Sequence, residues 1–379
     1  MYLKEFINAI LSIQDINKKL DSTFLERLTI SQSLLEGIST ENRSSGSPFF
    51  LNDLGVRYIV SAREYTEWNI KKLNLELPTS DELRSDMINA DIKLLPYIMD
   101  ACALITGDID TIFDVVCKRK NEILNFGSYT AEIYSGTVCA SKGSKLSYDF
   151  FLQAISRANS EKDINHVITG YHRLIITKLK RFTEFSDAQR LLNILLTEQI
   201  PKSKDKEMYM ALYDNMLGLA IVMEQSDFSW ISAKTMLINA TDRIQNYLTF
   251  CTDDTMRSQA ERYKGQVAIN LVQLEIQKNN LKSTNTIAIK NLNHVKKYSK
   301  GYIAEAYSTL AYTQFLLKDY KNAVITSKQS VNEHIKIGNY DGVKASREML
   351  IGNYMKLGMK KEAAKEAQLI LDKSFKLES

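Results

Sequence analysis

Hydrophobic residues recur every three or four positions along most of the chain, and one such pattern is written twice near its end. The first copy, within residues 304–330, carries Leu310 and Ala323, and the second carries Leu350 and Ala363, 40 residues later. This spacing places side chains on one face of an α-helix, and small residues let two antiparallel helices touch. A single pair cannot bury its apolar face, so such pairs stack. The pattern therefore predicts a stack of helical pairs with a concave side.

Turn-forming segments divide this helical pattern into two parts. Residues 41–48 hold a Gly-Ser-Pro cluster, and residues 77–82 combine a proline with a sequence that caps the start of a helix. We therefore predict a small helical unit at residues 1–80 and paired helices over residues 81–379. The pairs repeat at about 40 residues, against roughly 34 in the commonest tetratricopeptide repeat, which gives about six or seven pairs. The predicted fold is all-α: a TPR-like right-handed α-solenoid preceded by a small, HTH-like helical unit.

Composition supports this fold and narrows its setting. The 379 residues are 44% hydrophobic, with four prolines and fifteen glycines, fewer turn-formers than a β or α/β fold needs. The formal charge of +4 neither demands nor excludes nucleic acid. The four cysteines show no CxxC spacing, no apolar run is long enough for a membrane span, and the chain starts with charged residues. We expect reduced thiols, no membrane segment and a cytoplasmic location.

Motifs that carry enzyme chemistry are missing from the sequence. No glycine-rich phosphate loop and no GxSxG nucleophile motif occurs. The histidines are too far apart for an HExxH or HxxxH metal pair, and each is interpreted as a surface or groove residue: His166, His172, His294 and His334. We therefore expect no enzyme activity, no catalytic residue, no metal site and no cofactor.

Residues 21–40 have two interpretations. In the first they form a helix-turn-helix, with a turn at Thr29-Ile30 and a second helix that begins at residue 31. Recognition helices commonly begin with small polar residues that reach base edges, and an amide can pair with adenine. The DNA-binding candidates are then Lys19, Ser31, Gln32, Ser33 and Arg43. In the second interpretation, which the missing turn glycine and the balanced charge favour, these residues form a helical cap on the solenoid.

A peptide groove is the second candidate site. An extended peptide leaves its backbone N–H and C=O groups without partners, and Asn and Gln side chains can supply both a donor and an acceptor. Amides in the predicted first helices of the pairs are Asn215, Gln225, Gln266, Asn270, Gln314 and Asn353. Arg257 is suited to a peptide carboxylate, and Asp341 and Glu348 to a basic peptide side chain. The alternative for each of these residues is an ordinary polar surface position.

Short strings in the chain resemble a known group of receptors. They are Phe49–Asn52, Arg63-Glu64-Tyr65 followed by Asn89–Asp91, and Met256–Gln259 followed by Ile269-Asn270. Together with the chain length and the repeat spacing, these strings are similar to the peptide-sensing receptors of Gram-positive bacteria and their phages, the Rap, Npr, PlcR and PrgX (RRNPP) superfamily. Within it the sequence most resembles the AimR family, the arbitrium receptors of Bacillus phages.

The resemblance implies a specific function. Such receptors bind a secreted and re-imported signalling peptide of about six residues in the repeat groove and form homodimers through their C-terminal repeats. Arbitrium receptors bind double-stranded operator DNA through an N-terminal helix-turn-helix, control the phage lysis–lysogeny choice, and are inhibited by the peptide. Arg257 and Asn270 match peptide-binding positions of these receptors. Asp341 lies two residues from the position at which they have an acid that pairs with the arginine of the peptide. Two alternatives stay open: a Rap-like protein that binds a partner protein instead of DNA, and a TPR scaffold without a small ligand.

Overall fold

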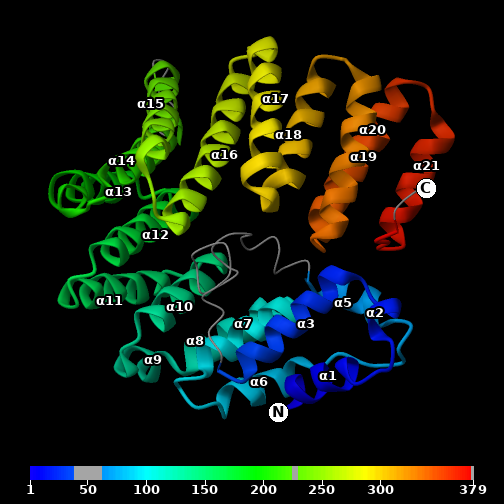
Figure 1. The fold of residues 1–379 in the computed structure, drawn as a ribbon, viewed down its shortest axis with the longest axis horizontal. Helices are drawn as coiled ribbons and strands as arrows, with labels where there is room; N and C mark the ends of the chain where they lie inside the picture. The colour runs from blue at the N-terminus through cyan, green and yellow to red at the C-terminus, as the bar shows by residue number, and fades with distance from the viewer. Residues whose placement is uncertain (38–61, 224–228, 377–379) are drawn as a thin grey trace. The chain divides into compact units, whose positions relative to one another are not determined.

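The computed structural model describes residues 1–37, 62–223 and 229–376, and within these ranges it holds helices and no strand. The predicted all-α, TPR-like fold is confirmed. None of the described helices combines the length and the apolar character of a membrane span. The chain forms two compact units, one from residues 1–126 together with 318–379, and one from residues 127–317 (Figure 1).

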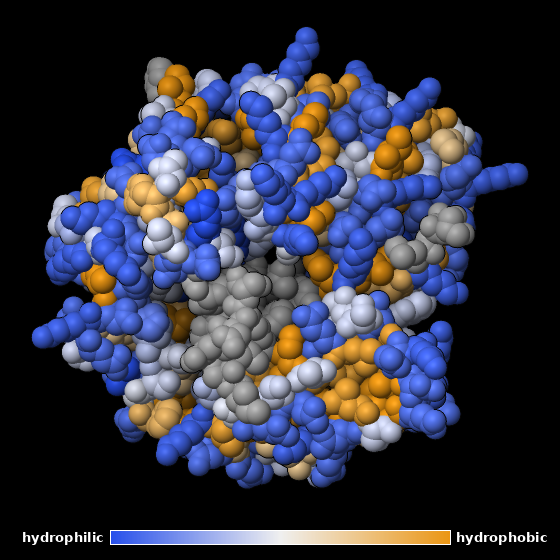
Figure 2. All heavy atoms as spheres, in the orientation of Figure 1, coloured by the Kyte–Doolittle hydropathy of each residue, from blue (hydrophilic) through white to orange (hydrophobic). Residues whose placement is uncertain are grey.

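The first unit is built from both ends of the chain. Its helices are α1 (Tyr2–Leu11), α2 (Ile16–Lys19), α3 (Ser22–Leu35), α5 (Ala62–Ile70), α6 (Ser80–Ile88), α7 (Leu95–Thr106), α8 (Ile109–Lys118), α9 (Lys120–Phe126), α19 (Tyr320–Lys336), α20 (Tyr340–Lys356) and α21 (Lys360–Leu371). Helix α7 is buried along nearly its whole surface and contacts α3, α5, α6 and α8, as expected for a helix that is apolar all round. Figure 2 shows hydrophobic side chains gathered over the N-terminal helices, within a face that is otherwise largely hydrophilic.

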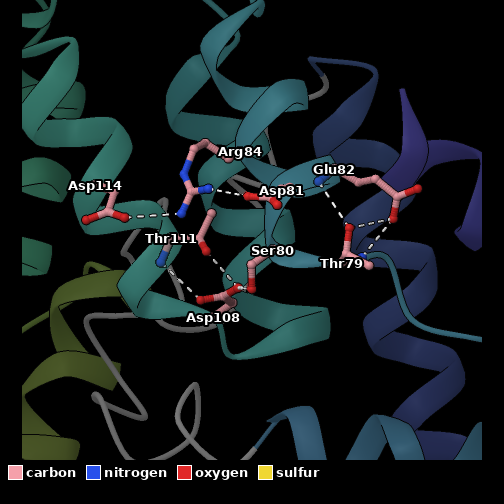
Figure 3. A network of polar contacts seen from close by, with 8 residues as sticks. All are labelled: Thr79, Ser80, Asp81, Glu82, Arg84, Asp108, Thr111 and Asp114. Atoms are coloured by element: carbon pink, nitrogen blue, oxygen red, sulfur yellow. Dashed lines mark hydrogen bonds and ion pairs between the residues drawn. The ribbon is translucent and has the colours of Figure 1, made fainter.

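Helix α6 begins at the predicted capping sequence. The Thr79 side chain accepts the backbone N–H of Glu82, and the Glu82 carboxylate accepts the backbone N–H of Thr79 at 2.8 Å, which completes a capping box. The Asp108 carboxylate caps α8 and accepts the Ser80 hydroxyl at 2.6 Å, so the starts of the two helices are joined (Figure 3). The predicted helix start is confirmed.

The predicted unit boundary at residue 80 is wrong. The Asp86 carboxylate, in α6, accepts the backbone N–H groups of Tyr2 and Leu3 at 3.0 and 2.9 Å. Helix α6 therefore closes directly onto α1, and the compact unit continues to residue 126. The proline and the cap end one helix and start another, but they do not separate two cores.

The predicted helix-turn-helix at residues 21–40 is also wrong. Helix α3 is continuous from Ser22 to Leu35, because Thr29 and Ile30 are compatible with a helix and no glycine interrupts the apolar stripe. Ser31 is fully buried. The side-chain amide of Gln32 donates to Asn8 at 3.0 Å, and the Ser33 hydroxyl donates to the carbonyl of Thr29 at 3.1 Å. Ser31, Gln32 and Ser33 therefore do not begin a recognition helix. Lys19 is exposed at the end of α2, and Arg43 lies outside the described residues.

Within the first unit, the N-terminal helices pack on the last helices of the chain. The Arg27 guanidinium donates to the carbonyl of Ile337 at 2.5 Å. Gly338 has a left-handed backbone, φ +63°, and a Cβ there would lie 2.5 Å from the Tyr65 ring. The ring of Phe375 lies 5.3 Å from that of Tyr65, with Phe375 itself buried. Contacts between residues about three hundred positions apart thus join the two ends of the chain in one core.

Arg347 secures the C-terminal segment of the same unit. Its side chain is 1% exposed, and its guanidinium donates to the carbonyls of Ser374 at 2.7 Å and Lys376 at 3.0 Å. Its Nε lies 3.4 Å from the carboxylate of Glu366, which is also buried. The fork of donors is suited to several acceptors in fixed geometry, so one side chain ties the segment after α21 to α20.

The second unit is a continuous stretch of paired helices. They are α10 (Tyr129–Ser141), α11 (Leu146–Ser160), α12 (Ile164–Phe182), α13 (Phe185–Ile194), α14 (Lys206–Met223), α15 (Ser229–Phe250), α16 (Asp254–Gln277), α17 (Leu281–Tyr298) and α18 (Ile303–Leu316), with short helices η2 (Leu195–Gln199), η3 (Ile200–Lys202) and η4 (Lys300–Tyr302). The first helices of successive pairs, α10, α12, α14, α16 and α18, contact one another in that order. Because the first helices touch their equivalents in the neighbouring pairs, we take them as the inner layer of this stack.

The twice-written pattern has two outcomes. The second copy is a helical pair, α20 against α21, as predicted. The first copy is divided between the units, because α18 packs on α16 and α17 through Val272, Leu292 and Leu310, whereas α19 packs on α20. The division falls after Leu317, at Lys318, whose φ is +64°. The periodicity located both helices correctly but assigned α18 and α19 to one pair.

Replacement of Arg347 by Ala should lower the free energy of unfolding by about 3–5 kcal/mol, because the substitution leaves the buried Glu366 carboxylate without its cation. Thermal or urea unfolding followed by circular dichroism measures the change. Lys344→Ala in the same helix is the matched control. Its ion pair with Glu348 is 4.0 Å long and exposed, so the loss there should be about 0.5 kcal/mol or less. Equal losses in the two variants would contradict a structural role for Arg347.

Candidate functional site

A chain of three side-chain amides joins two neighbouring inner helices of the second unit. The amide nitrogen of Asn270, in α16, donates to the amide oxygen of Asn215, in α14, at 2.8 Å. Gln266, one turn before Asn270, donates from its own amide to the Asn270 oxygen at 3.2 Å. Asn215 is buried, and the other two are half-buried. Asn215 and Asn270 were both predicted as groove residues, and the structure brings them together with Gln266.

Small residues near the amides let the surrounding helices approach one another. A Cβ on Gly218 would lie 3.3 Å from the carbonyl of Ala233 in α15, and a Cβ on Gly265 would lie 3.0 Å from Val295 in α17. Both distances are tighter than ordinary van der Waals contact. Each inner helix is thus seated closely on the second helix of its pair, which fixes the position of its amides.

Positive charge and aromatic rings lie on the same inner helices. The ring of His172, in α12, meets that of Tyr263, in α16, edge to face at 6.2 Å. The Arg262 guanidinium lies 4.6 Å from the Tyr263 ring, and it donates to the Tyr302 hydroxyl at 3.3 Å. Residues 262, 266 and 270 follow one another at a spacing of four, which places them on one face of α16. This face therefore presents a guanidinium and two amides in a row.

The titration of His172 reflects this environment. Loss of solvation lowers the pKa of the imidazole to about 3, and the charges of Arg173, Arg262 and Lys180 lower it further in the same direction. The ring is therefore neutral at physiological pH. A neutral imidazole offers one hydrogen-bond donor and one acceptor, and it leaves the positive charge of this face to the arginines.

Two tyrosines of the unit remain protonated for a related reason. Burial raises the pKa of both Tyr129 and Tyr209 above its ordinary value. Tyr129 stacks on the ring of His166 at 4.1 Å, and its hydroxyl donates to the backbone carbonyl of the same residue at 3.0 Å. These phenols therefore act as neutral hydrogen-bond donors and as apolar faces.

The other predicted peptide contacts fall elsewhere. Arg257 donates to the carbonyls of Leu248 and Cys251 at 3.1 and 3.0 Å, so it closes the C-terminal end of α15 while its side chain remains exposed. Asp341 and Glu348 are exposed residues of α20 and belong to the first unit. Gln225 lies outside the described residues. In the second unit the structure therefore joins Asn215 to Asn270, whereas it gives Arg257 a capping role.

Sequence reasoning missed His172, Arg262 and Tyr263 as members of one cluster. His172 was assigned only to a surface or groove position, and the neighbours Arg262 and Tyr263 were not considered. The spacing of four residues from Arg262 to Asn270 was the available signal. No group of three metal-binding side chains is found in the ranges that the structure covers.

Comparison with known proteins gives a likeness of fold. No protein-family model and no curated protein matches the chain. Among solved structures, the apo form of the quorum sensor NprR from B. thuringiensis has a TM-score of 0.50 at 15% identity, over 98% of this chain and 97% of that one. NprR in complex with its cognate peptide NprX has a TM-score of 0.46 at 14% identity, over 98% and 97%. A STAND ATPase with a tetratricopeptide repeat sensor from Pyrococcus horikoshii has a TM-score of 0.49 at 12% identity, over 98% and 56%.

The depressed pKa of His172 predicts acid sensitivity. The His172 ring takes up a proton less readily in the folded protein than in the unfolded chain. The free energy of unfolding should therefore be unaffected above the unfolded pKa of about 6.5 and should fall as the pH drops toward 3. At pH 5 the wild type should have lost up to about 2 kcal/mol relative to His172→Gln. Urea unfolding of both proteins, repeated at roughly six pH values between about 4.5 and 7.5, measures this difference. Parallel stability curves for the two proteins over that range would contradict it.

Proposed function

We propose that this protein is a peptide-responsive transcription regulator of the arbitrium type. In this proposal a short imported signalling peptide binds the inner helices of the second unit and inhibits a homodimer that binds operator DNA and controls the phage lysis–lysogeny choice. The observation that carries the peptide part is the amide chain from Gln266 through Asn270 to Asn215, which crosses between two inner helices. The fold likeness to the quorum sensor NprR supports it.

The amide chain suits the backbone of an extended peptide. Each amide offers a donor and an acceptor, and in the free protein these groups are occupied by one another. A bound peptide exchanges those bonds for bonds to its own N–H and C=O groups, so no buried polar group is left unsatisfied in either state. Such an exchange has a small net enthalpy, but a ligand that cannot make it leaves amides unpaired at about 1–3 kcal/mol each. The amides thereby select for a peptide backbone.

The neighbouring charges give the peptide a direction. Arg262 stands one turn before Gln266 on the same face of α16 and is followed by the aromatic ring of Tyr263. A guanidinium is suited to the peptide's C-terminal carboxylate, and a neutral His172 adds no repulsion against a basic peptide side chain. We infer that the carboxyl end of the peptide lies on the Arg262 side of the amides.

Peptide binding to several repeats can change the geometry of the stack. Each helical pair contacts only its neighbours, so the pitch of a solenoid is soft. The chain passes between the two units at Gly127 and Lys318, which both have left-handed backbone, φ +78° and +64°. In a dimer that reads two half-sites, a change of pitch alters the spacing of the DNA-binding ends, and the mismatch lowers DNA affinity. Peptide and operator then weaken each other's binding by the same factor.

One observation favours a second candidate function. Because α3 is a single helix with Ser31 buried, the residues expected to read DNA bases do not present a recognition helix. A Rap-like regulator that binds a partner protein instead of DNA uses the same peptide site and needs no such helix. The two candidates therefore differ in whether the first unit binds DNA or a partner protein, and they share the peptide site of the second unit.

Peptide binding can be tested by calorimetric titration with synthetic hexapeptides that represent candidate signals. A cognate peptide should bind, and Asn270→Ala should weaken it about tenfold, because the substitution removes one bond to the peptide and unpairs Asn215. The matched control is Asn246→Ala, an exposed amide on the second helix α15. Equally strong binding by both variants would show that the peptide does not bind at the amide chain. No binding by any peptide would favour a scaffold without a small ligand.

The output can be tested by an electrophoretic shift of intergenic DNA from the phage that encodes the protein. The wild type should shift specific DNA, and the cognate peptide should reduce the shift. The double variant Gln32→Ala/Ser33→Ala should shift the DNA as well as wild type does, because neither side chain leads a recognition helix. Loss of the shift in this variant would indicate that Gln32 or Ser33 does contact DNA bases. If no specific DNA is shifted while peptide binding persists, the partner-protein candidate is the correct one.

A further inference from the structure

A cavity in the first unit lies where its N-terminal helices meet the C-terminal segment. Its volume is about 640 Å³, and it is lined by Lys19 at the end of α2, by Trp68, Lys71 and Lys72 at the end of α5, and by Lys376 after α21. A volume of several hundred cubic ångströms is typical of small-molecule sites. None of the peptide-site residues belongs to this cavity, so it is independent of the function proposed above.

The four lysines that line the cavity share one electrostatic property. Within the part of the chain that the structure describes, none of the ammonium groups of Lys19, Lys71, Lys72 and Lys376 has an ion pair or a hydrogen bond. Nearby Lys373, which does not line the cavity, pairs with Glu64 at 3.7 Å. An excess of ammonium groups over carboxylates in one lining raises the local concentration of anions. The lining is thus prepared for a ligand with several negative charges.

Two carboxylates also line the cavity, and one oxygen of each, Oδ1, is already engaged. Asp21 caps α3 by accepting the backbone N–H groups of Thr23 and Phe24 at 2.9 and 3.3 Å, and it also accepts the hydroxyl of Tyr65. Asp372 accepts the side-chain amide of Gln368 at 2.9 Å. Against four lysines, these two aspartates leave a formal excess of two positive charges in the lining. The Oδ1 atoms of the two aspartates bond to neighbouring groups of the protein, and the lysines give the lining its net positive charge.

An aromatic ring completes the site. The indole of Trp68 is half-buried and lines the cavity, and its ring lies 6.3 Å from that of Phe375. A partly exposed indole offers an apolar aromatic surface to a second ring. Stacking of a nucleobase on such a face contributes about 1–3 kcal/mol. The combination of an indole with four lysines in one lining matches a molecule that has a planar base at one end and phosphates at the other.

We propose that this cavity binds a nucleotide, with its base on Trp68 and its phosphates among Lys19, Lys71, Lys72 and Lys376. The cavity is lined by residues from both ends of the chain and gathers its lysines in one place, whereas duplex DNA requires basic residues spread along an extended surface. An acidic peptide supplies the charge but lacks a base for the indole. Because Lys71 and Lys72 follow α5 and Lys376 follows α21, a bound nucleotide bridges the N-terminal helices and the C-terminal segment. Binding therefore also stabilises the first unit.

Calorimetry and fluorescence together test the site in the full-length protein. The chain has two tryptophans, so Trp230→Phe leaves Trp68 as the one reporter. ATP should bind in the calorimeter and quench Trp68 fluorescence, after correction for absorption by the nucleotide, and should raise the melting temperature. Tripolyphosphate, which lacks the base, and adenosine, which lacks the phosphates, should each bind at least about tenfold more weakly than ATP.

Matched charge variants locate the site. Lys71→Gln/Lys72→Gln should weaken ATP binding roughly tenfold, and more at low salt than at high salt. The control is Lys360→Gln/Lys361→Gln, which removes the same charge from exposed residues of α21 outside the cavity and should leave ATP affinity unchanged. Equal weakening by both pairs, an absence of ATP binding, equal affinity for tripolyphosphate, or binding of duplex DNA alone would each overturn the proposal. A failure here does not affect the peptide titration, which reports on the other unit.

Discussion

Each helical pair in this protein depends on a neighbour to bury its apolar face, and the pair formed by α20 and α21 is no exception. The N-terminal helices meet this need. Tyr65 of α5 packs on Gly338 and Phe375, and Arg27 of α3 bonds to the carbonyl of Ile337. Terminal repeats require a cap to remain stable and soluble. Here the cap is the start of the same chain, which explains why the first unit contains residues from both ends.

The same constraint determines what could be predicted from the sequence. Helix spacing is a local property, so the all-α fold, the start of α6 at Thr79 and the pairing of α20 with α21 followed from it. The packing of α3 on α7, and of Arg27 and Tyr65 on the segment after α19, joins positions far apart along the chain and leaves no periodic signal. The helix-turn-helix prediction was wrong for this reason. Ser31 is a small polar residue of the kind that begins a recognition helix, but it is buried within the first unit.

The candidate site was predictable in part. An amide was expected on each of two inner helices, and Asn215 and Asn270 are hydrogen-bonded to one another at 2.8 Å. The capping bonds of Arg257 to Leu248 and Cys251 could not be predicted, because they depend on where α15 ends; its contact with a peptide stays a prediction. Asp341 and Glu348, predicted to pair with a basic side chain of the peptide, lie in the first unit, and this role stays a prediction. A pattern that repeats along the chain gives the phase of a helix, but it does not show where one compact unit ends.

The division of the chain into two units also sets the order in which they can fold during synthesis. The second unit is one uninterrupted stretch, so it can fold while the ribosome is still adding residues, as separate units generally do. The first unit cannot be completed at that stage, because Tyr65 must wait for Phe375 to leave the exit tunnel. Until then the N-terminal helices are exposed without their partner. A chain that stops before Phe375 therefore lacks the ring that packs on Tyr65 in the core of the first unit.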